Sequence, residues 1–419
     1  MKTKKMLITV IATIAFIAST QAQNVNIPDA NFKAALVSNA SINTNMDTEI
    51  QVSEASVFNG AINVSYLNIT DLTGIAAFVL LDSLNCRFNP LISFDVYANT
   101  VLTYINCGPF INDNMGFEDS IDFSANTMLT YLNCSGVIGL GVENSLSSIN
   151  VTGLNNLTYL DCGANILVSL DVSTNTSLNY LDCSSACVNG GIGSDFAQLT
   201  NLNLSGAIAL TYLDCSFDGN GSPLGPGWIA QSSFGYLDVS SNTALTYINC
   251  SRNVLTSLDV SSCTALTTLR CSSNQLTSLN VKNGNNINMF EWENPLDGSY
   301  HPAFLAYNNP NLSCIEVDNV AWSTANWLEI DATASFSENC SAVGILDDNE
   351  SNEPMFYPNP TTGSIYLSEP ANITLSDLSG KLLLEEKNTN QLDISLLPAG
   401  MYFLHFGDNN NQIVKVIKE

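Results

Sequence analysis

A short apolar pattern recurs along the middle of the chain and constrains its fold more than any other feature. Eight copies of Leu-x-x-Leu-x-Cys, with Ile in place of the second Leu in two of them, end at Cys86, Cys107, Cys134, Cys162, Cys183, Cys215, Cys250 and Cys271. The shortest interval between copies is 21 residues, and it occurs three times. Such a period predicts a solenoid, in which each turn buries its apolar side chains only against neighbouring turns.

The form of one turn resembles a known repeat. Residues 266–276 read L-x-x-L-x-C-x-x-N-x-L, which resembles the leucine-rich repeat with Cys at the third apolar position, over residues 79–313. The resemblance implies that Leu266, Leu269, Cys271 and Leu276 point inward and that Asn274 hydrogen-bonds the turning backbone. Each turn also has a second half, such as Leu255–Val260, which turns the chain back and supplies the apolar side chains of the opposite wall. We therefore expect a β-rich solenoid with terminal caps.

Insertions separate some of the copies. We measured the distance along the sequence from each repeat Cys to the first apolar residue of the second half that follows it. This distance is 8 residues in four repeats and 14 to 22 residues in the other four. All the extra residues enter the same segment, and because equivalent segments stack, we expect these loops along one edge. Loops on a rigid scaffold often carry binding, but insertions are also simply tolerated, and both interpretations stay open.

The two ends of a solenoid need covers. We assign residues 23–78 to an N-terminal cap region, in which Ile27–Val37 predicts a short helix with Asp29 as N-cap and Phe32 and Leu36 on one face. We assign residues 314–345 to a C-terminal cap.

The twelve cysteines fall into classes. In an exported protein they would normally suggest disulfides, but eight hold one repeat position and are explained as small buried apolar side chains. Cys263 occupies a position where other turns carry Asn, and Cys187 lies in an insertion. Cys314 and Cys340 follow the repeats and are the best disulfide candidates. This segment resembles the end of related bacterial repeat proteins, where two cysteines close a cap.

The first 22 residues have the pattern of a secretory signal peptide, with early lysines, an apolar stretch and a small-residue cleavage site. The alternative is a membrane anchor, but the apolar stretch is shorter than the ~20 residues that span a bilayer. The formal charge is −27, and residues 23–345 hold 5 Lys and Arg against 28 Asp and Glu. This charge disfavours nucleic acid and anionic lipid as partners and suits cations or basic partners.

The composition changes at Leu346. Residues 346–355 form an acidic linker, and residues 356–419 alternate as a small Ig-like β-sandwich would, with strands expected at Ser364–Leu367, Ile373–Leu375, Lys381–Leu384, Met401–Phe406 and Ile413–Ile417.

Four motifs of this tail stand in a recognisable order: FYPNPTTG at 356–363, LSDLSGKLL at 375–383, LPAGMYFL at 397–404 and KVIKE at 415–419. They resemble the C-terminal sorting domain of type IX secretion substrates in Gram-negative bacteria. The resemblance implies recognition by the type IX machinery, passage across the outer membrane, and a place at the cell surface or outside the cell. A plain adhesion module is the alternative.

Little in the sequence points to catalysis. The chain has two histidines, His301 and His405, and neither a phosphate-binding glycine motif nor zinc-ligand spacing is present. We expect a non-enzymatic protein without a cofactor, apart from weak calcium binding at one loop.

That loop is Asn43–Glu54, which resembles an EF-hand calcium loop. Asn43, Asn45, Asp47, the backbone of Glu49, and Glu54 would occupy ligand positions. Asn at the first position and Thr48 in place of the turn glycine should weaken binding. A weak calcium site and a metal-free turn are the two interpretations.

The solvent-facing positions of the repeat carry the candidate binding residues. Because parallel strands lie about 4.8 Å apart, we expect a column of rings from Tyr104, Tyr131, Tyr159, Tyr180, Tyr212 and Tyr247. A threonine row (Thr103, Thr130, Thr158, Thr211 and Thr246) runs on one side, and Asn106, Asn133, Asp161, Asp182, Asp214 and Asn249 run on the other. Such a face suits a glycan or a protein partner, but strand preference alone also explains Tyr and Thr. A cation would relieve the repulsion among the three aspartates, as would water and salt.

These observations favour a cell-surface binding or adhesion protein whose ligand is a protein or a glycan. The alternatives are a structural surface-coat component without a specific ligand and, third, an enzyme that uses the loops and His301.

Overall fold

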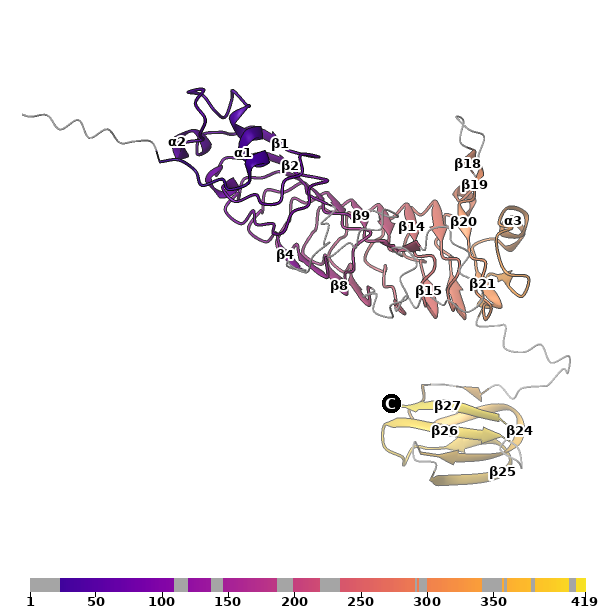
Figure 1. The fold of residues 1–419 in the computed structure, drawn as a ribbon. Helices are drawn as coiled ribbons and strands as arrows, with labels where there is room; N and C mark the ends of the chain where they lie inside the picture. The colour runs from indigo at the N-terminus through magenta and orange to yellow at the C-terminus, as the bar shows by residue number, and fades with distance from the viewer. Residues whose placement is uncertain are drawn as a thin grey trace, which may run out of the picture. The chain divides into compact units, whose positions relative to one another are not determined.

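The chain forms two compact units, residues 1–343 and residues 344–419, in a computed structural model (Figure 1). The structure describes residues 23–108, 120–136, 146–186, 199–218, 234–290, 292–293, 300–340, 356–357, 360–377, 381–406 and 412–419. Among these residues, no helix has the length and apolar character needed to cross a membrane. Each unit is described by itself.

Ten short parallel strands form the long sheet of the first unit, and each pairs in register with the next. In sheet order they are β1 (Ala61–Asn63), β2 (Ser83–Asn85), β3 (Tyr104–Asn106), β5 (Tyr131–Asn133), β7 (Tyr159–Asp161), β9 (Tyr180–Asp182), β12 (Tyr212–Asp214), β14 (Tyr247–Asn249), β16 (Thr268–Arg270) and β20 (Phe304–Leu305). The central residue of every three-residue strand in this sheet is Leu or Ile and is at most 3 % exposed. The predicted solenoid is confirmed.

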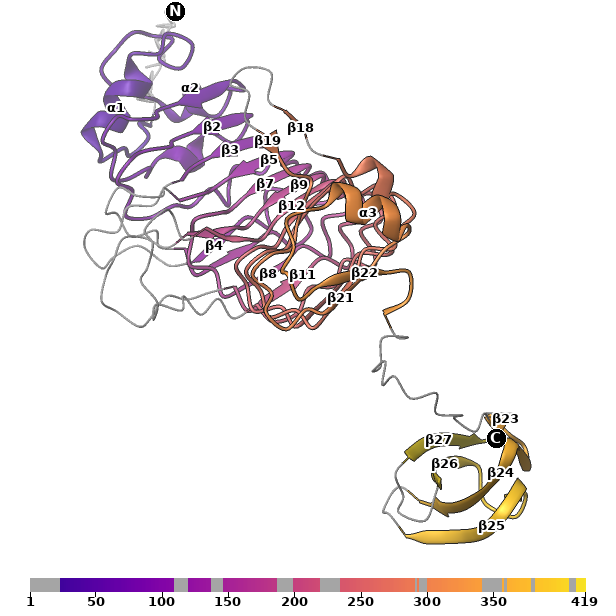
Figure 2. The same ribbon diagram turned by 90° about the vertical axis from the view of Figure 1, so that its right-hand side faces the viewer.

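A second set of strands comes from the second halves of the turns. It comprises the pairs β4 (Ser120–Asp122) with β6 (Ser148–Asn150) and β8 (Ser169–Asp171) with β11 (Asn201–Asn203), and the sheet of β15 (Ser257–Asp259), β17 (Ser278–Asn280), β21 (Cys314–Glu316) and β22 (Ser335–Ser337). Figure 2 shows β4, β8 and β21 on the other side of the coil from β7 and β9. The apolar core lies between the two sides.

Two small ladders complete the unit. Strand β10 (Ser185–Ala186) pairs with β13 (Phe217–Asp218), and β18 (Trp292–Glu293) pairs with β19 (Tyr300–His301). Residues 109–119, 137–145, 187–198 and 219–233, which make up most of the four insertions, lie outside the described residues. The edge that they would share therefore stays a prediction.

The eight repeat cysteines are buried free thiols inside the coil. Burial raises the pKa of Cys86 and of Cys271 to about 12. These thiols therefore stay protonated and pack as apolar groups.

Two sets of asparagines hold the turns together. Asn274, as predicted, donates to the carbonyls of Cys250 and Cys271 at 3.1 and 3.0 Å, and its oxygen accepts from the Leu255 amide. A second set, on the other side of the coil, donates to two carbonyls of the preceding turn in the same way: Asn99, Asn126, Asn175 and Asn242. Cys263 continues this second set, with its sulfur 3.8 Å from each of two carbonyls.

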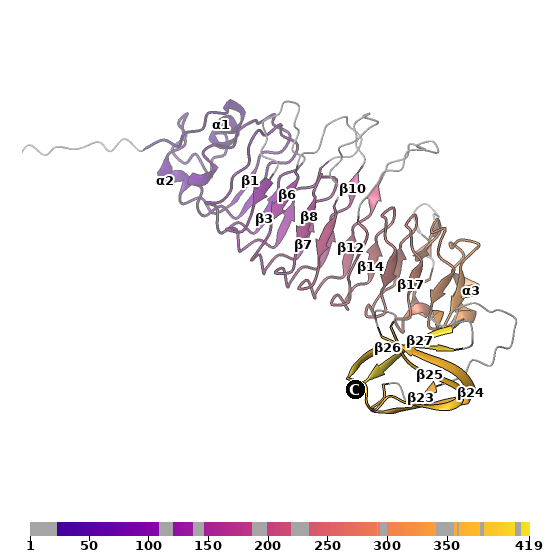
Figure 3. The ribbon, with the colours of Figure 1, turned by 90° about the horizontal axis from the view of Figure 1, so that it is seen from below.

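Short helices cover the first turn (Figure 3). Helix α1 (Ala30–Val37) begins where predicted, because Asp29 accepts a hydrogen bond from the Phe32 amide, and Phe32 and Leu36 are buried. Helix α2 (Val52–Ala55) and the 3₁₀ turn η1 (Ile75–Ala77) lie between α1 and β2 in the chain.

The last turn is covered by η2 (Asn286–Asn288), α3 (Val320–Asn326) and aromatic rings. Trp327 stacks on Phe304 at 4.2 Å between ring centroids, and its indole N–H donates to the Met289 carbonyl. Cys314 and Cys340 are joined by a disulfide, with their Cα atoms 5.8 Å apart.

The second unit is an antiparallel β domain with its own core. It contains β23 (Phe356–Tyr357), β24 (Ser364–Ser376), β25 (Leu382–Asp393), β26 (Gly400–Phe406) and β27 (Gln412–Lys418). The two separate strands expected at 364–367 and 373–375 were wrong, since β24 is one strand. Register shifts in its pairing with β25 keep it continuous past Pro370. The shifts also bend the strand, so that it pairs with β23 near one end and β26 near the other.

Candidate binding face

The tyrosine column forms because one repeat position supplies the first residue of successive strands. β3, β5, β7, β9, β12 and β14 pair tyrosine to tyrosine. Neighbouring ring centroids are 4.4 to 4.5 Å apart and the ring planes differ by 4° to 9°. Each inner tyrosine thus has a ring on both of its faces, and all six are half-buried. The column presents ring edges and hydroxyl groups to solvent, not ring faces.

The two ends of the column differ. At one end the guanidinium carbon of Arg270 lies 5.8 Å from the centroid of the Tyr247 ring, within cation–π range. At the other end Tyr104 pairs in register with Ser83, whose side chain is too small to cover a ring.

The threonine row is part of the scaffold. Thr130 donates its hydroxyl hydrogen to the Thr103 carbonyl at 3.1 Å, and Thr158 donates to Thr130 at 2.9 Å. Thr246 does the same to the Thr211 carbonyl. These hydroxyls tie each turn to the one before, so the row's regularity has a structural cause that the sequence pattern did not reveal.

In the Asn/Asp row on the other side of the rings, an asparagine side chain bonds an aspartate side chain at each end of the run of three aspartates. Asn133 donates to Asp161 at 2.9 Å, and Asn249 donates to Asp214 at 3.0 Å. Asp182 stands between the two other aspartates, and its Oδ1 accepts from the amide and the hydroxyl of Ser184. The row is a strip of three carboxylates with an amide donor at each end.

Burial and the carboxylates shift the pKa values of the groups on this face. Burial, and then the charge of Asp182, raises the pKa of Asp161 to about 6. Burial is also the main reason why the pKa of Asp214 is raised. Burial, and then the aspartate two residues later on the same strand, raises the pKa of Tyr159, Tyr180 and Tyr212. The tyrosine hydroxyls therefore keep their protons and can donate hydrogen bonds at any physiological pH.

Among the residues with assigned structure, no three His, Cys, Asp or Glu side chains are grouped closely enough to hold an ion.

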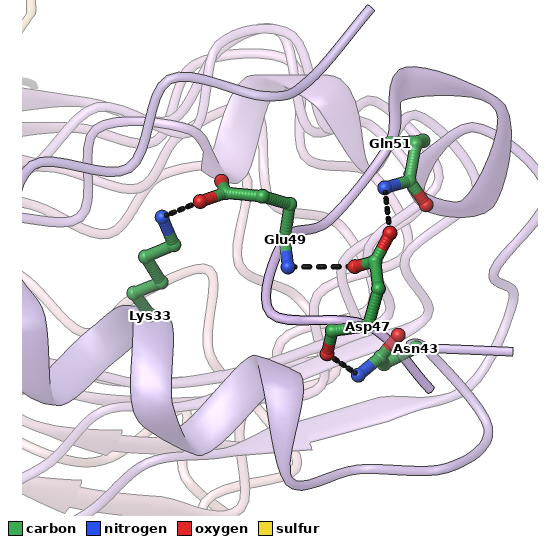
Figure 4. Close-up of polar contacts among 5 residues, drawn as sticks. All are labelled: Lys33, Asn43, Asp47, Glu49 and Gln51. Atoms are coloured by element: carbon green, nitrogen blue, oxygen red, sulfur yellow. Dashed lines mark hydrogen bonds and ion pairs between the residues drawn. The ribbon is translucent and has the colours of Figure 1, made fainter. Parts of the chain in front are cut away.

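The EF-hand-like loop is held by hydrogen bonds among its candidate ligands (Figure 4). Asp47 accepts from the Glu49 amide at 2.7 Å and from the side chains of Asn45 and Gln51 at 2.9 Å. Asn43 donates to the Asp47 carbonyl, and the Glu49 carboxylate pairs with Lys33.

Glu54 closes the same loop. Its two oxygens accept from Thr44, Asn45 and the Gln51 amide. Burial alone would raise the Glu54 pKa, but these hydrogen bonds outweigh it and lower the pKa. Calcium binding here stays a prediction, and an ion would have to displace the hydrogen bonds of Asp47 and Glu54.

Of the two histidines, the structure describes the side chain of one, His405. The side chain of His301 lies outside the described part of the structure. In the tail, Nε2 of His405 lies 2.8 Å from the Ser376 hydroxyl, while its buried Nδ1 has no hydrogen-bond partner among the described residues. The third group that orients the histidine of a hydrolase is therefore not seen at this pair.

Comparison with known proteins supports export. Residues 355–419 match the family described as the secretion system C-terminal sorting domain. No curated protein matches the chain.

Several solved structures are similar to the chain. The functional domain of InlJ from Listeria monocytogenes, which includes a cysteine ladder, is 23% identical, with 95% of this chain and 98% of that one covered, at a TM-score of 0.35. Internalin C2 from the same organism is 17% identical over 71% and 98% of the two chains, at 0.34. A leucine-rich-repeat protein from Leptospira interrogans is 14% identical over 64% and 75%, at 0.33.

The fold assignment depends on the strand ladder itself, and the localisation depends on the sorting domain at the C-terminus. The protein is a leucine-rich-repeat solenoid that carries a type IX sorting domain at its C-terminus and is exported to the cell surface or beyond it.

Proposed function

We propose that the solenoid binds a protein partner through the face formed by the tyrosine column and the adjoining Asn/Asp row. The observation that carries the proposal is the column itself, six tyrosines in register with ring spacings of 4.4 to 4.5 Å. Stacking fixes these side chains before any partner arrives, so binding sacrifices little side-chain entropy. Tyrosine is also enriched where protein interfaces concentrate their binding energy.

Ring geometry favours a protein over a glycan as the partner. A sugar ring packs its C–H groups on an aromatic face, which carries the negative side of the ring quadrupole. Between Tyr104 and Tyr247 every inner ring face is occupied by the next tyrosine, so along the column sugars would meet only edges and hydroxyls. A polypeptide can use both, through hydrogen bonds to the hydroxyls and apolar contact along the edges.

The charge of the face supports a basic partner. Asp161, Asp182 and Asp214 adjoin the rings, and residues 23–345 carry far more acidic than basic groups. A field of this sign speeds encounter with positively charged surfaces.

The test replaces Tyr159, Tyr180 and Tyr212 with Ser and measures retention on arrays of extracellular proteins and of glycans. A matched control replaces Tyr97, Tyr236 and Tyr307, which are 43 to 69% exposed and lie outside the column, with Ser. We expect the column variant to lose about tenfold or more in affinity and the control to keep it. Equal retention of both variants would contradict the proposal, and a wild-type protein that retains nothing would favour a surface coat without a ligand.

A further inference from the structure

The open end of the tyrosine column has the features of a receptor for one flat group. Tyr104 stacks on Tyr131 on one side, and this is its only ring contact among the described residues. On the other side the register places Ser83, and beyond it Ala61. Neither side chain reaches across a ring, so no residue that the structure describes is seen to cover this aromatic face at the end of the column.

The chain itself shows what covers such a face. At the opposite end of the column the Arg270 guanidinium lies over Tyr247 at 5.8 Å. A second, smaller stack has the same arrangement: Phe88 stacks on Tyr66 at 4.4 Å, and the Arg87 guanidinium lies over Phe88 at 4.8 Å. Two aromatic stacks of this unit therefore end on an arginine, while the Tyr104 end does not.

The surroundings of Tyr104 suit a cation as well. Asp82 precedes Ser83 in the chain, is exposed, and accepts one hydrogen bond at 3.0 Å from the Thr103 hydroxyl. A guanidinium that stacks on the ring presents its N–H groups outward in its own plane, parallel to the ring, where a carboxylate beside the stack can accept them. The chain's own spare cations are few, because Lys33 is paired with Glu49 and Arg87 and Arg270 lie on rings.

The geometry points to a partner arginine: a basic segment of the bound protein places one guanidinium on the open face of Tyr104, beside the Asp82 carboxylate. This inference rests on the proposed function and adds to it the chemistry of the partner and the place of one anchoring contact. Arginine over tyrosine is among the side-chain pairs that interfaces favour.

A single substitution tests the contact by copying the covered end. Arg270 stands opposite Asn249 in the register, and the equivalent place at the open end is Asn85, opposite Asn106. Asn85→Arg should therefore lay the chain's own guanidinium on Tyr104. Asn63→Arg, one strand further out, makes the same change in charge without reaching the ring and is the matched control.

The probe is a fluorescent Gly/Ser peptide with spaced arginines, alongside versions with lysine or with uncharged citrulline, measured by anisotropy on the whole mature protein. We expect Asn85→Arg to weaken binding of the arginine peptide roughly tenfold and Asn63→Arg to leave most of it. Tyr104→Leu, which removes the face without adding charge, should give the same loss. The lysine peptide should bind less tightly than the arginine peptide, and the citrulline peptide least.

The outcomes separate this inference from the proposed function. If the column variant loses its array partner but Asn85→Arg and Tyr104→Leu bind the arginine peptide like wild type, the arginine contact is wrong and the binding face stands. Equal binding of the lysine and arginine peptides would also overturn it. So would an Asn85→Arg variant that loses retention of a glycan on the arrays but still binds the arginine peptide. If the column variant and its control bind array partners alike, both the proposed function and the arginine contact are wrong.

Discussion

The cysteine and tyrosine columns come from the same repeats and behave in opposite ways: in six of the eight repeats a tyrosine opens the strand and the cysteine directly follows its last residue. The cysteines point inward, are buried, and hold thiols whose pKa is raised by that burial. The tyrosines point outward, stack on one another, and leave their edges and hydroxyls at the surface. One copied unit therefore yields a chemically inert ladder inside and a regular polar surface outside. Regularity alone is not evidence of function, because both columns are equally regular; exposure and chemistry distinguish them.

Thiol reactivity tests the difference between the two columns with the largest expected effect. In a Cys187→Ser background, we expect the repeat cysteines of the native protein to react with a thiol reagent on the order of a thousandfold more slowly than an exposed cysteine, because burial suppresses the thiolate. Tyr236→Cys, at a position that is 69% exposed, supplies that exposed reference. The measurement is the labelling rate at pH 8, with unfolded protein as the control for total thiol. Rapid labelling of the native wild-type repeats would contradict the assignment of an inert inner column.

The carboxylate strip gives the next largest effect. The folded-state pKa of Asp161, about 6, lies above the ordinary value of 3.8, so folding favours its protonated form. This contribution to stability is fully present below about pH 4 and is lost as the pH rises through about 6. Asp161→Asn should therefore raise the free energy of unfolding at pH 7 by roughly 1–3 kcal/mol, with little effect at pH 4.

The measurement is the denaturation midpoint of both proteins from pH 4 to 8. Asp171→Asn, on the other side of the coil, is the matched control, because hydrogen bonds from Ser173 lower the pKa of Asp171 and its contribution has the opposite sign. The same pH profile for both variants would show that the strip is not electrostatically strained.

The smallest effect concerns the second set of asparagines, Asn99, Asn126, Asn175 and Asn242. Cys263 takes the place of an asparagine but approaches two carbonyls only through sulfur, at 3.8 Å. Cys263→Asn should restore two N–H donors there and stabilise the unit by about 1 kcal/mol or less, because the amide oxygen is left buried. Asn242→Cys is the converse and should cost a similar amount. If Cys263→Asn destabilised the unit and Asn242→Cys stabilised it, the site would prefer sulfur.

The repeat pattern predicted the solenoid and the tyrosine column, since both follow from the period and the register of the strands. The resemblance to the leucine-rich repeat implied the inward-pointing cysteines and the role of Asn274. The pattern did not predict where the threonine hydroxyls bond, how closely the rings stack, or that Arg270 would cover one end, since those depend on rotamers chosen among neighbours. The left-handed backbone of Phe88 and Arg252, each two residues after a repeat cysteine, was also hidden, because neither is a glycine. In the tail, the two strands expected at 364–367 and 373–375 are one strand, β24, because bulges in its pairing with β25 keep it continuous.

A crystal structure of the solenoid with a partner retained from the arrays would show directly whether the tyrosine column binds. We predict that the partner lies on the long sheet and contacts the edges and hydroxyls of Tyr159, Tyr180 and Tyr212, with acidic groups of the Asn/Asp row facing basic residues of the partner. A partner seated elsewhere, with these tyrosines still open to solvent, would contradict it.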